Sequence, residues 1–348
     1  MRVAFVYPNP RAELSRQVAA GTAPDTGLMG QNHLSEFGIE SFVHDSAIRR
    51  EHAVSGLSHR FTWIAREATL PWELRHVDLV VTPLVNLLPL VARLQHRPRV
   101  LLLSYGTAAL WARASRPRRA LIRASVKAAD AIVTISAAGR DRIIREIGVD
   151  ATRVQSAPFG IDETFWQAAP PVAAGHVLTV GRDLARDYKT FAEAVDGLRV
   201  RAVIVAKDEN LRDVRLPVNV EVRKYIDIDE LRQLYVDAAC VVVPMVPDAD
   251  PRGTESSGNT ALLEAMACGR ATVATDRASL REYVYDDATI NAPPEDPTAL
   301  RAAIQRLLDA PSDAAAMGAA ARRHVVERHT TTRFAERLSA IIRHVGAG

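Results

Sequence analysis

The sequence contains too few cysteines for a disulfide scaffold and no apolar run long enough for a membrane helix. Its two cysteines, Cys240 and Cys268, both lie in apolar stretches, which indicates buried thiols in a reducing compartment. The longest apolar stretch, residues 79–92, is interrupted by polar residues and prolines, whereas a membrane helix needs about 20 apolar residues. The first residues carry no signal-peptide pattern. We therefore expect a cytoplasmic protein that does not span a membrane.

The sequence also lacks a large charge of either sign. It has 44 Lys and Arg against 41 Asp and Glu, a net charge of +3, so we expect no nucleic-acid partner. The basic residues gather in one stretch without an acid, namely Arg113, Arg116, Arg118, Arg119, Arg123 and Lys127. This stretch, residues 113–127, could contact an anionic acceptor or the surface of an anionic membrane, with Trp111 as an interfacial anchor. It could equally be an exposed arginine-rich helix.

Several catalytic motifs are absent as well. There is no Gly-x-Ser-x-Gly, which excludes the nucleophile elbow of an α/β-hydrolase. There is no Gly-Lys-Ser/Thr of a P-loop, which argues against a P-loop ATPase. The histidines of the first half of the chain lack metal-ligand spacing, and core or surface positions explain them. We expect neither a metal nor a cofactor.

Short apolar runs alternate with longer amphipathic stretches in two successive series. Because the runs are mostly apolar rather than alternating, they suit strands that are buried on both faces of a parallel sheet. The expected strands of the first series are 3–7, 41–44, 79–82, 100–104, 131–135 and 154–157. Those of the second series are 176–180, 202–206, 221–225, 239–243 and 271–274.

The 348 residues exceed one ordinary core, so two domains are expected. The series of strands and helices predict an α/β protein with two doubly wound, Rossmann-like domains that face each other across a cleft. The predicted domains are residues 1–168 and 169–348, joined near the proline-containing segment 167–175. The last helix, near residues 332–344, could pack back on the first domain.

Residues 251–276 read as a loop, the start of a helix and a following strand. Ser256, Ser257 and Gly258 lead into the helix, and Gly269 ends it. The free backbone N–H groups of Gly258, Asn259 and Thr260 would form an anion site suited to a phosphate. Glu264, inside the first turns, could accept hydrogen bonds from the vicinal hydroxyls of a ribose. The alternative is a capped helix with a solvent-facing glutamate.

A second polar segment, residues 177–194, begins at the end of an expected strand. Gly181 permits close approach of the backbone, and the guanidinium groups of Arg182 and Arg186 suit phosphate oxygens. Arg182 directly follows the glycine, so the topology directs it toward the cleft. Arg186 and Lys189 could instead belong to a solvated helix surface.

Together these two segments resemble the carboxyl-terminal domain of the retaining family-four glycosyltransferases of the GT-B fold. The run Glu264-Ala-Met-Ala-Cys-Gly269 matches the family motif residue for residue, and Gly181-Arg182 matches its Gly-Arg. Arg186 falls where the family usually has a lysine. Residues 159–162 are similar to the Asn-Gly-Val-Asp turn that closes the family's first domain.

The resemblance implies a nucleoside-diphosphate-sugar donor, of the UDP or GDP type, that is bound mainly by the second domain. Arg182 and Arg186 would bind the diphosphate and act in catalysis, Glu264 would bind the ribose, and residues 256–260 would hold phosphate or sugar oxygens. A hexose would be transferred with retention of configuration to a hydroxyl acceptor, which could be a small molecule, a lipid or a glycan. Positive charge rather than a metal would stabilise the leaving diphosphate.

Three departures from the family concern the placement of the sugar. The first glutamate of the family's pair is expected at Ser256, and Glu255 lies one residue earlier. Either Glu255 serves as the catalytic carboxylate or the sugar is held differently. Where the first domain of the family offers a histidine, this chain has Ser104 and Tyr105. The usual Gly-Gly pair is missing, and Gly27 is among the glycines that could replace it.

The base would be chosen by loops such as residues 224–227, which include Tyr225. Two alternatives stay open beside the glycosyltransferase. One is a phosphorylase-like enzyme that needs inorganic phosphate and no nucleotide, and the other is a catalytically inactive protein that binds sugar or nucleotide.

Overall fold

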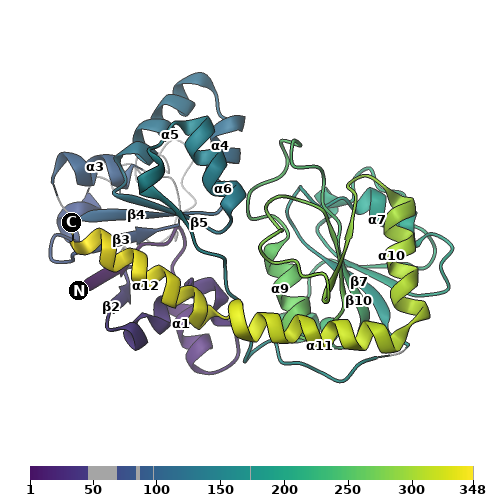
Figure 1. Ribbon diagram of the computed structural model, residues 1–348. Helices are drawn as coiled ribbons and strands as arrows, with labels where there is room; N and C mark the ends of the chain where they lie inside the picture. The colour runs from purple at the N-terminus through teal and green to yellow at the C-terminus, as the bar shows by residue number, and fades with distance from the viewer. Residues whose placement is uncertain (46–68, 84–86, 97, 173, 348) are drawn as a thin grey trace. The chain divides into compact units, whose positions relative to one another are not determined.

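The computed structural model describes residues 1–45, 69–83, 87–96, 98–172 and 174–347. The chain forms two compact units (Figure 1). The first comprises Met1–Pro158 with Thr331–Gly348, and the second comprises Phe159–Thr330. The sequence places the boundary ten residues later, between 168 and 169, and leaves the place of the last helix open. In the structure that helix, α12 (Thr331–Ala347), belongs to the first unit.

The first unit contains a six-stranded sheet in the order β2-β1-β3-β4-β5-β6, and every pairing is parallel. The strands are β1 (Arg2–Phe5), β2 (Glu40–Val43), β3 (Leu79–Thr82), β4 (Arg99–Ser104), β5 (Ala131–Thr134) and β6 (Val154–Ser156). Each overlaps an apolar run of the first series, which confirms these predictions. The central strands β3, β4 and β5 are buried along almost their whole length, as a sheet covered on both faces requires.

Helices of the first unit follow the strands. They are α1 (Ala12–Ala19), α3 (Leu88–Leu94), α4 (Thr107–Arg113), α5 (Arg116–Ala128) and α6 (Ala137–Arg142), with short 3₁₀ segments η1 (Asp25–Leu28) and η2 (Gln31–Phe37). Gly148 has a φ of 74° and ends the π-helical turn that continues α6, so the expected C-terminal cap is confirmed. Helix α12 packs on η2. There a Cβ on Gly30 would lie 3.1 Å from the Cβ of Ala335.

The second unit repeats the plan with a parallel sheet in the order β12-β11-β10-β7-β8-β9. Its strands are β7 (His176–Val180), β8 (Ala202–Val205), β9 (Val220–Arg223), β10 (Ala238–Val243), β11 (Thr272–Thr275) and β12 (Thr289–Ala292). The apolar runs predict every one of them except β12. The order places β7 beside β10, so the loops that follow these two strands leave the same edge of the sheet.

Helices cover both faces of this second sheet. They are α7 (Tyr188–Val195), α8 (Ile228–Val236), α9 (Asn259–Ala267), α10 (Pro297–Asp309) and α11 (Pro311–Arg328). Helices α7 and α10 share a hydrophobic core with the sheet, and α9 contacts β10 and β11 from the other side (Figure 1). Helix α9 begins directly after Gly258, and Gly269, with a φ of 71°, follows its end, as the sequence predicts. The two doubly wound units confirm the expected fold class.

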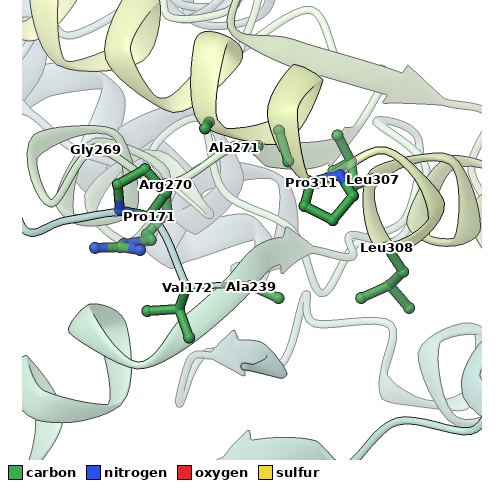
Figure 2. A pocket seen from close by; sticks show the side chains of 11 residues that line it. Pro171, Val172, Ala239, Gly269, Arg270, Ala271, Leu307, Leu308 and Pro311 are labelled. Carbon is green, nitrogen blue, oxygen red and sulfur yellow. The ribbon is translucent and has the colours of Figure 1, made fainter. Parts of the chain in front are cut away.

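The segment that leads into β7 is fixed to the base of the second unit. The Arg270 Nη2 donates hydrogen bonds of 2.8 Å to the carbonyl oxygens of Ala169 and Pro170. A cavity of about 20 Å³ lies here, lined by residues that include Pro171, Gly269 and Pro311 (Figure 2). It has room for about one water molecule. This place therefore serves packing and is too small for a substrate.

The basic stretch of the first unit forms most of α5. The ring of Trp111 is covered by the guanidinium groups of Arg119 and Arg123, whose Cζ atoms lie 5.1 and 5.3 Å from its centroid. The same ring packs against a hydrophobic core cluster of the unit. Trp111 thus has neighbours within its own unit, and its contact with a membrane surface stays a prediction. Within the described ranges, no helix combines the length and apolar character that crossing a bilayer requires.

Candidate active site

A cavity of about 480 Å³ lies in the second unit at the carboxyl ends of β7 and β8. Its volume is in the range of small-molecule sites. The wall is formed by the loop after β7, the segment before α8, the loop before α9 and the first turns of α9. The lining residues include Gly181, Arg182, Asp183, Arg186, Ser256, Ser257, Gly258, Thr260 and Glu264. The structure therefore brings together most of the residues that the two sequence segments single out.

The loop after β7 is fixed by backbone hydrogen bonds to the end of β10. Asp187 N–H donates to the Pro244 carbonyl at 3.0 Å, and Val246 N–H donates to the Ala185 carbonyl at 2.9 Å. The Tyr188 hydroxyl adds a bond of 2.6 Å to the carbonyl oxygen of Gly181. These bonds hold Arg186 at the cavity wall, so its position is set by the backbone rather than by a mobile loop.

Arg186 is buried, with 7% of the residue exposed. Its Nε donates to Asp183 Oδ2 at 3.0 Å, whereas its Nη1 has no hydrogen-bond partner among the described residues. A buried donor without a partner costs about 1–3 kcal/mol. Such a cost is retained at binding sites, where a ligand supplies the missing acceptor. An anionic oxygen suits a guanidinium best.

Arg182 lines the same cavity but is exposed. Its Nη2 makes a long hydrogen bond of 3.4 Å to the carbonyl oxygen of Lys224. A bond of this length is weak, so the guanidinium can turn toward a ligand at little cost. The two arginines therefore differ: Arg186 is fixed in place, and Arg182 can adapt.

Helix α9 begins at the cavity with Gly258 as its N-cap residue. Gly258 has a φ of 95°, and a Cβ there would lie 3.2 Å from Val243 Cγ1 and 3.3 Å from Met245 Sδ. A larger residue would thus meet both strain and crowding. Since no side chain caps the helix, its first N–H groups remain available to an anion at the positive end of the helix dipole.

The loop before α9 is shaped by hydroxyl groups. Thr254 Oγ1 lies 2.9 Å from Ser257 Oγ and 3.2 Å from Ser256 Oγ. This turn puts Ser256 and Ser257 at the cavity wall, whereas Glu255 is buried, with 5% exposed, and does not line the cavity. The turn thus directs Ser256 rather than Glu255 to this wall, and the role of Glu255 as the site's carboxylate stays a prediction.

Glu264 lines the cavity from the second turn of α9 and meets a tyrosine from α8. The hydroxyl of Tyr235 donates to Glu264 Oε2 at 2.8 Å. Burial raises the pKa of Glu264 to about 7, and the bond from Tyr235 and the charge of Arg186 oppose that rise. Near neutral pH the carboxyl group is thus poised between its neutral and ionised forms.

The other predicted residues are not among those that line this cavity. Asn259 is buried, and Lys189 and Tyr225 are exposed. In the first unit, Ser104 Oγ accepts a 3.4 Å bond from Thr107 N–H, and Tyr105 follows it half-buried. A Cβ on Gly27 would lie 2.7 Å from Leu14 Cδ2, the end of a side chain that can move aside. Their part in a site stays a prediction.

The sequence analysis does not identify two residues that hydrogen-bond to side chains of the cavity wall. Asp183 accepts from Arg186, and its spacing of three residues from the arginine is a usable signal in the sequence. Tyr235 is 29 residues from Glu264 in the sequence, and only the packing of α8 beside α9 at this cavity joins the two.

Residues 174–310 match the family model of the glycosyl transferases group 1. The second unit is a group 1 glycosyltransferase domain. The matched residues contain every side chain that lines the cavity. The resemblance seen in the sequence is thereby confirmed for the glycosyltransferase group.

Curated proteins that are similar to this chain include alpha-maltose-1-phosphate synthase of Mycolicibacterium smegmatis. It is 29% identical over 262 residues, which cover 65% of this chain and 66% of that protein. The protein of the same name from Mycobacterium tuberculosis is 26% identical over 64% of this chain and 65% of its own length. The match thus spans slightly less than two thirds of these relatives.

Solved structures share the fold over nearly the whole chain. Sucrose-phosphate synthase from Thermosynechococcus elongatus has a TM-score of 0.73 at 17% identity and covers 100% of this chain and 99% of its own. Anabaena HepE, solved in complex with UDP-glucose, has a TM-score of 0.71 at 13% identity and covers 99% and 100%. The predicted GT-B fold is confirmed by this likeness and by the two parallel sheets.

Proposed function

We propose that the protein is a glycosyltransferase that moves a sugar from a nucleoside-diphosphate-sugar donor to a hydroxyl acceptor. The observation that carries the proposal is the meeting, in one cavity, of Arg182, Arg186, the uncapped start of α9 and Glu264. A nucleoside diphosphate has an anion for the first three groups and ribose hydroxyls for the last. The family match of this unit and the HepE complex with UDP-glucose support the choice of ligand class.

In this proposal the residues act on the charge that develops as the sugar leaves. The bond between the anomeric carbon and the diphosphate breaks, and negative charge grows on the diphosphate oxygens. Arg186, already in place and short of an acceptor, needs no rearrangement to stabilise that charge. Arg182 adds a second positive charge. We propose that a hexose is transferred with retention and that these charges, rather than a metal, serve the leaving group.

The donor sugar is held, in this proposal, by hydroxyl groups in place of the first family glutamate. Ser256 and Ser257 lie at the wall near the start of α9. Their oxygens can both donate to and accept from sugar hydroxyls. We propose that the acceptor binds to the first unit. Because one group of relatives is named for maltose 1-phosphate and one solved structure for sucrose phosphate, phosphorylated sugars belong among the first acceptors tested.

A thermal-shift panel tests the donor class directly. UDP, GDP, ADP and inorganic phosphate are each added to the purified chain, because a ligand that binds the folded state raises its melting temperature. Stabilisation by UDP or GDP supports the proposal, and stabilisation by phosphate alone would replace it with a phosphorylase. Slow hydrolysis or transfer from UDP-glucose or GDP-mannose then separates an active enzyme from a protein that only binds nucleotide.

A further inference from the structure

Tyr235 is fixed more firmly than its hydrogen bond to Glu264 alone would require. The residue is fully buried, and its ring meets Trp166 edge to face, with centroids 5.5 Å apart at 82°. The carbonyl oxygen of Trp166 in turn accepts a 3.0 Å bond from Arg322 Nη1. That same Nη1 binds the carbonyl of Ala267, the last residue of α9, at 2.9 Å. Tyr235 and helix α9, which carries Glu264, are therefore both held by contacts that lead to Arg322.

The hydrogen bond from Tyr235 has a fixed direction. A carboxylate only accepts, so the phenol must donate, and burial raises the pKa of Tyr235 so that it keeps its proton. The bond engages Oε2 of Glu264. A glutamate side chain has three rotatable torsions, and the loss of this hydrogen bond would let the carboxyl group leave the cavity wall.

The groups that face Glu264 come from three elements. Arg186 lies in the loop before α7, Tyr235 on α8 and Cys268 at the end of α9. Arg182, Asp183 and Asp227 also line the cavity. The charge of Arg186 and the hydrogen bond from the Tyr235 hydroxyl favour the ionised form of the Glu264 carboxyl group. Burial disfavours that form.

We propose that Tyr235 is the positioning residue for Glu264: its hydroxyl holds the carboxyl group toward the ribose of the bound nucleotide and favours its ionised form. This inference rests on the function proposed above. It goes further in assigning to a buried residue, which cannot touch the ligand, control over the recognition of the ribose.

The test measures how strongly the chain distinguishes UDP from 2′-deoxy-UDP across the pH range 5.5 to 9. If the wild-type chain binds GDP more tightly, GDP and 2′-deoxy-GDP replace them. The ratio of the two dissociation constants isolates the ribose hydroxyl, because the phosphates titrate alike in both probes. The variants are Tyr235→Phe, Glu264→Gln and the double variant. Tyr283→Phe is the matched control, since Tyr283 is also fully buried and its hydroxyl accepts from Phe159 N–H.

In the wild-type chain the ratio should rise with pH as Glu264 ionises, because charge-assisted bonds are about twice as strong as neutral ones. In Tyr235→Phe the midpoint should move upward by about one pH unit, the effect of a lost bond to a charged group. The ratio at neutral pH should fall about three- to tenfold. Tyr283→Phe should follow the wild type, and Tyr235→Phe should add nothing in the Glu264→Gln background.

Three results would overturn the inference, and they are distinguishable. If no nucleoside diphosphate binds, the proposed function fails and this inference with it. If nucleotide binds but the ratio of the two dissociation constants in the wild type is independent of pH, Glu264 does not bind the ribose hydroxyl. If the wild type shows the rise but Tyr235→Phe keeps its midpoint and ratio, the proposed function stands and Tyr235 has only a packing role. A Tyr235→Phe chain that fails to fold is replaced by Trp166→Phe, which removes the edge contact and should shift the midpoint in the same direction.

Discussion

Gly181 leaves the space that the guanidinium group of Arg186 fills. A Cβ on residue 181 would collide with Nε of Arg186 and would lie 2.6 Å from its Cζ. Since that guanidinium also binds Asp183 and packs in a buried position, it has little room to retreat. The absence of a side chain at Gly181 thus permits Arg186 to lie at the cavity wall.

Gly181→Ala is therefore expected to displace Arg186 and weaken nucleotide binding by about tenfold or more, since bonds to charged groups contribute about 1.5–3 kcal/mol. Titration calorimetry with UDP or GDP measures the change. The control is a double-mutant cycle with Arg186→Gln: if the glycine acts through the arginine, adding Gly181→Ala to Arg186→Gln should cost nothing more. Additive losses would show that the alanine disturbs the site by another route.

Arg182→Ala should lower turnover by roughly 10²–10³-fold, as the loss of one charge-stabilising donor commonly does. The exposed guanidinium contributes little to folding, so the melting temperature should stay within about 2 °C of the wild type. Arg199→Ala is the matched control, because Arg199 is also exposed on the second unit and does not line the cavity. Steady-state rates with the preferred donor, measured for both variants and the wild type, test this prediction. Unchanged turnover in Arg182→Ala would refute its assigned role.

Glu264 makes the stability of the protein depend on pH. Burial raises its pKa from 4.5 to about 7, so the folded state holds the proton more tightly than the unfolded chain. Stability linked to this group is then fully present below pH 4.5 and declines as the pH rises toward 7, by on the order of 2 kcal/mol. Glu264→Gln removes this dependence. We expect urea unfolding to show that the free energy of unfolding of Glu264→Gln, relative to the wild type, is higher at pH 8 than at pH 5. The same difference between the two chains at both pH values would contradict the assignment.

His33 predicts a loss of stability with rising pH in the first unit as well, in a higher pH window than that of Glu264. Its pKa is raised to about 9, first by the hydrogen bond with Asp25 and further by Glu36, which together outweigh burial. Asp25 also accepts a 3.0 Å bond from Thr331, where α12 begins. The linked stability is complete below pH 6.5 and disappears as the pH rises through 9.

The matched variant for this ion pair is His33→Gln, which can keep a hydrogen bond but cannot titrate. Because the side chain is partly exposed, we expect a difference on the order of 1–2 kcal/mol between pH 6.5 and 9. Thermal melting at both pH values measures it, and the wild type should lose more stability than the variant. The same loss in both chains would mean that His33 is not charged in the folded protein.

The sequence predicts those parts of the molecule whose signal is local. Fully apolar runs such as 100–103 and 240–243 become buried parallel strands, and Gly269 ends α9 as expected. Strand β12 was missed because its residues, Thr-Ile-Asn-Ala, alternate in polarity at the edge of the sheet. Helix α11 was missed because its alanine-rich sequence shows no clear apolar stripe.

The candidate site follows the same division. The residues that line the cavity lie in two short segments with recognisable composition, so they could be named in advance. The choice between Glu255 and Ser256 could not be made, because it depends on hydroxyl bonds within a single turn. Tyr235 could not be found either, since its contact with Glu264 arises only from tertiary packing.

A structure determined with a bound nucleoside diphosphate tests the central claim most directly. The account predicts that the diphosphate lies in the cavity of the second unit, within hydrogen-bond distance of the Arg186 guanidinium and of the first backbone N–H groups of α9, with the ribose on Glu264. A nucleotide bound elsewhere, or one whose diphosphate leaves Arg186 and the start of α9 untouched, would contradict it.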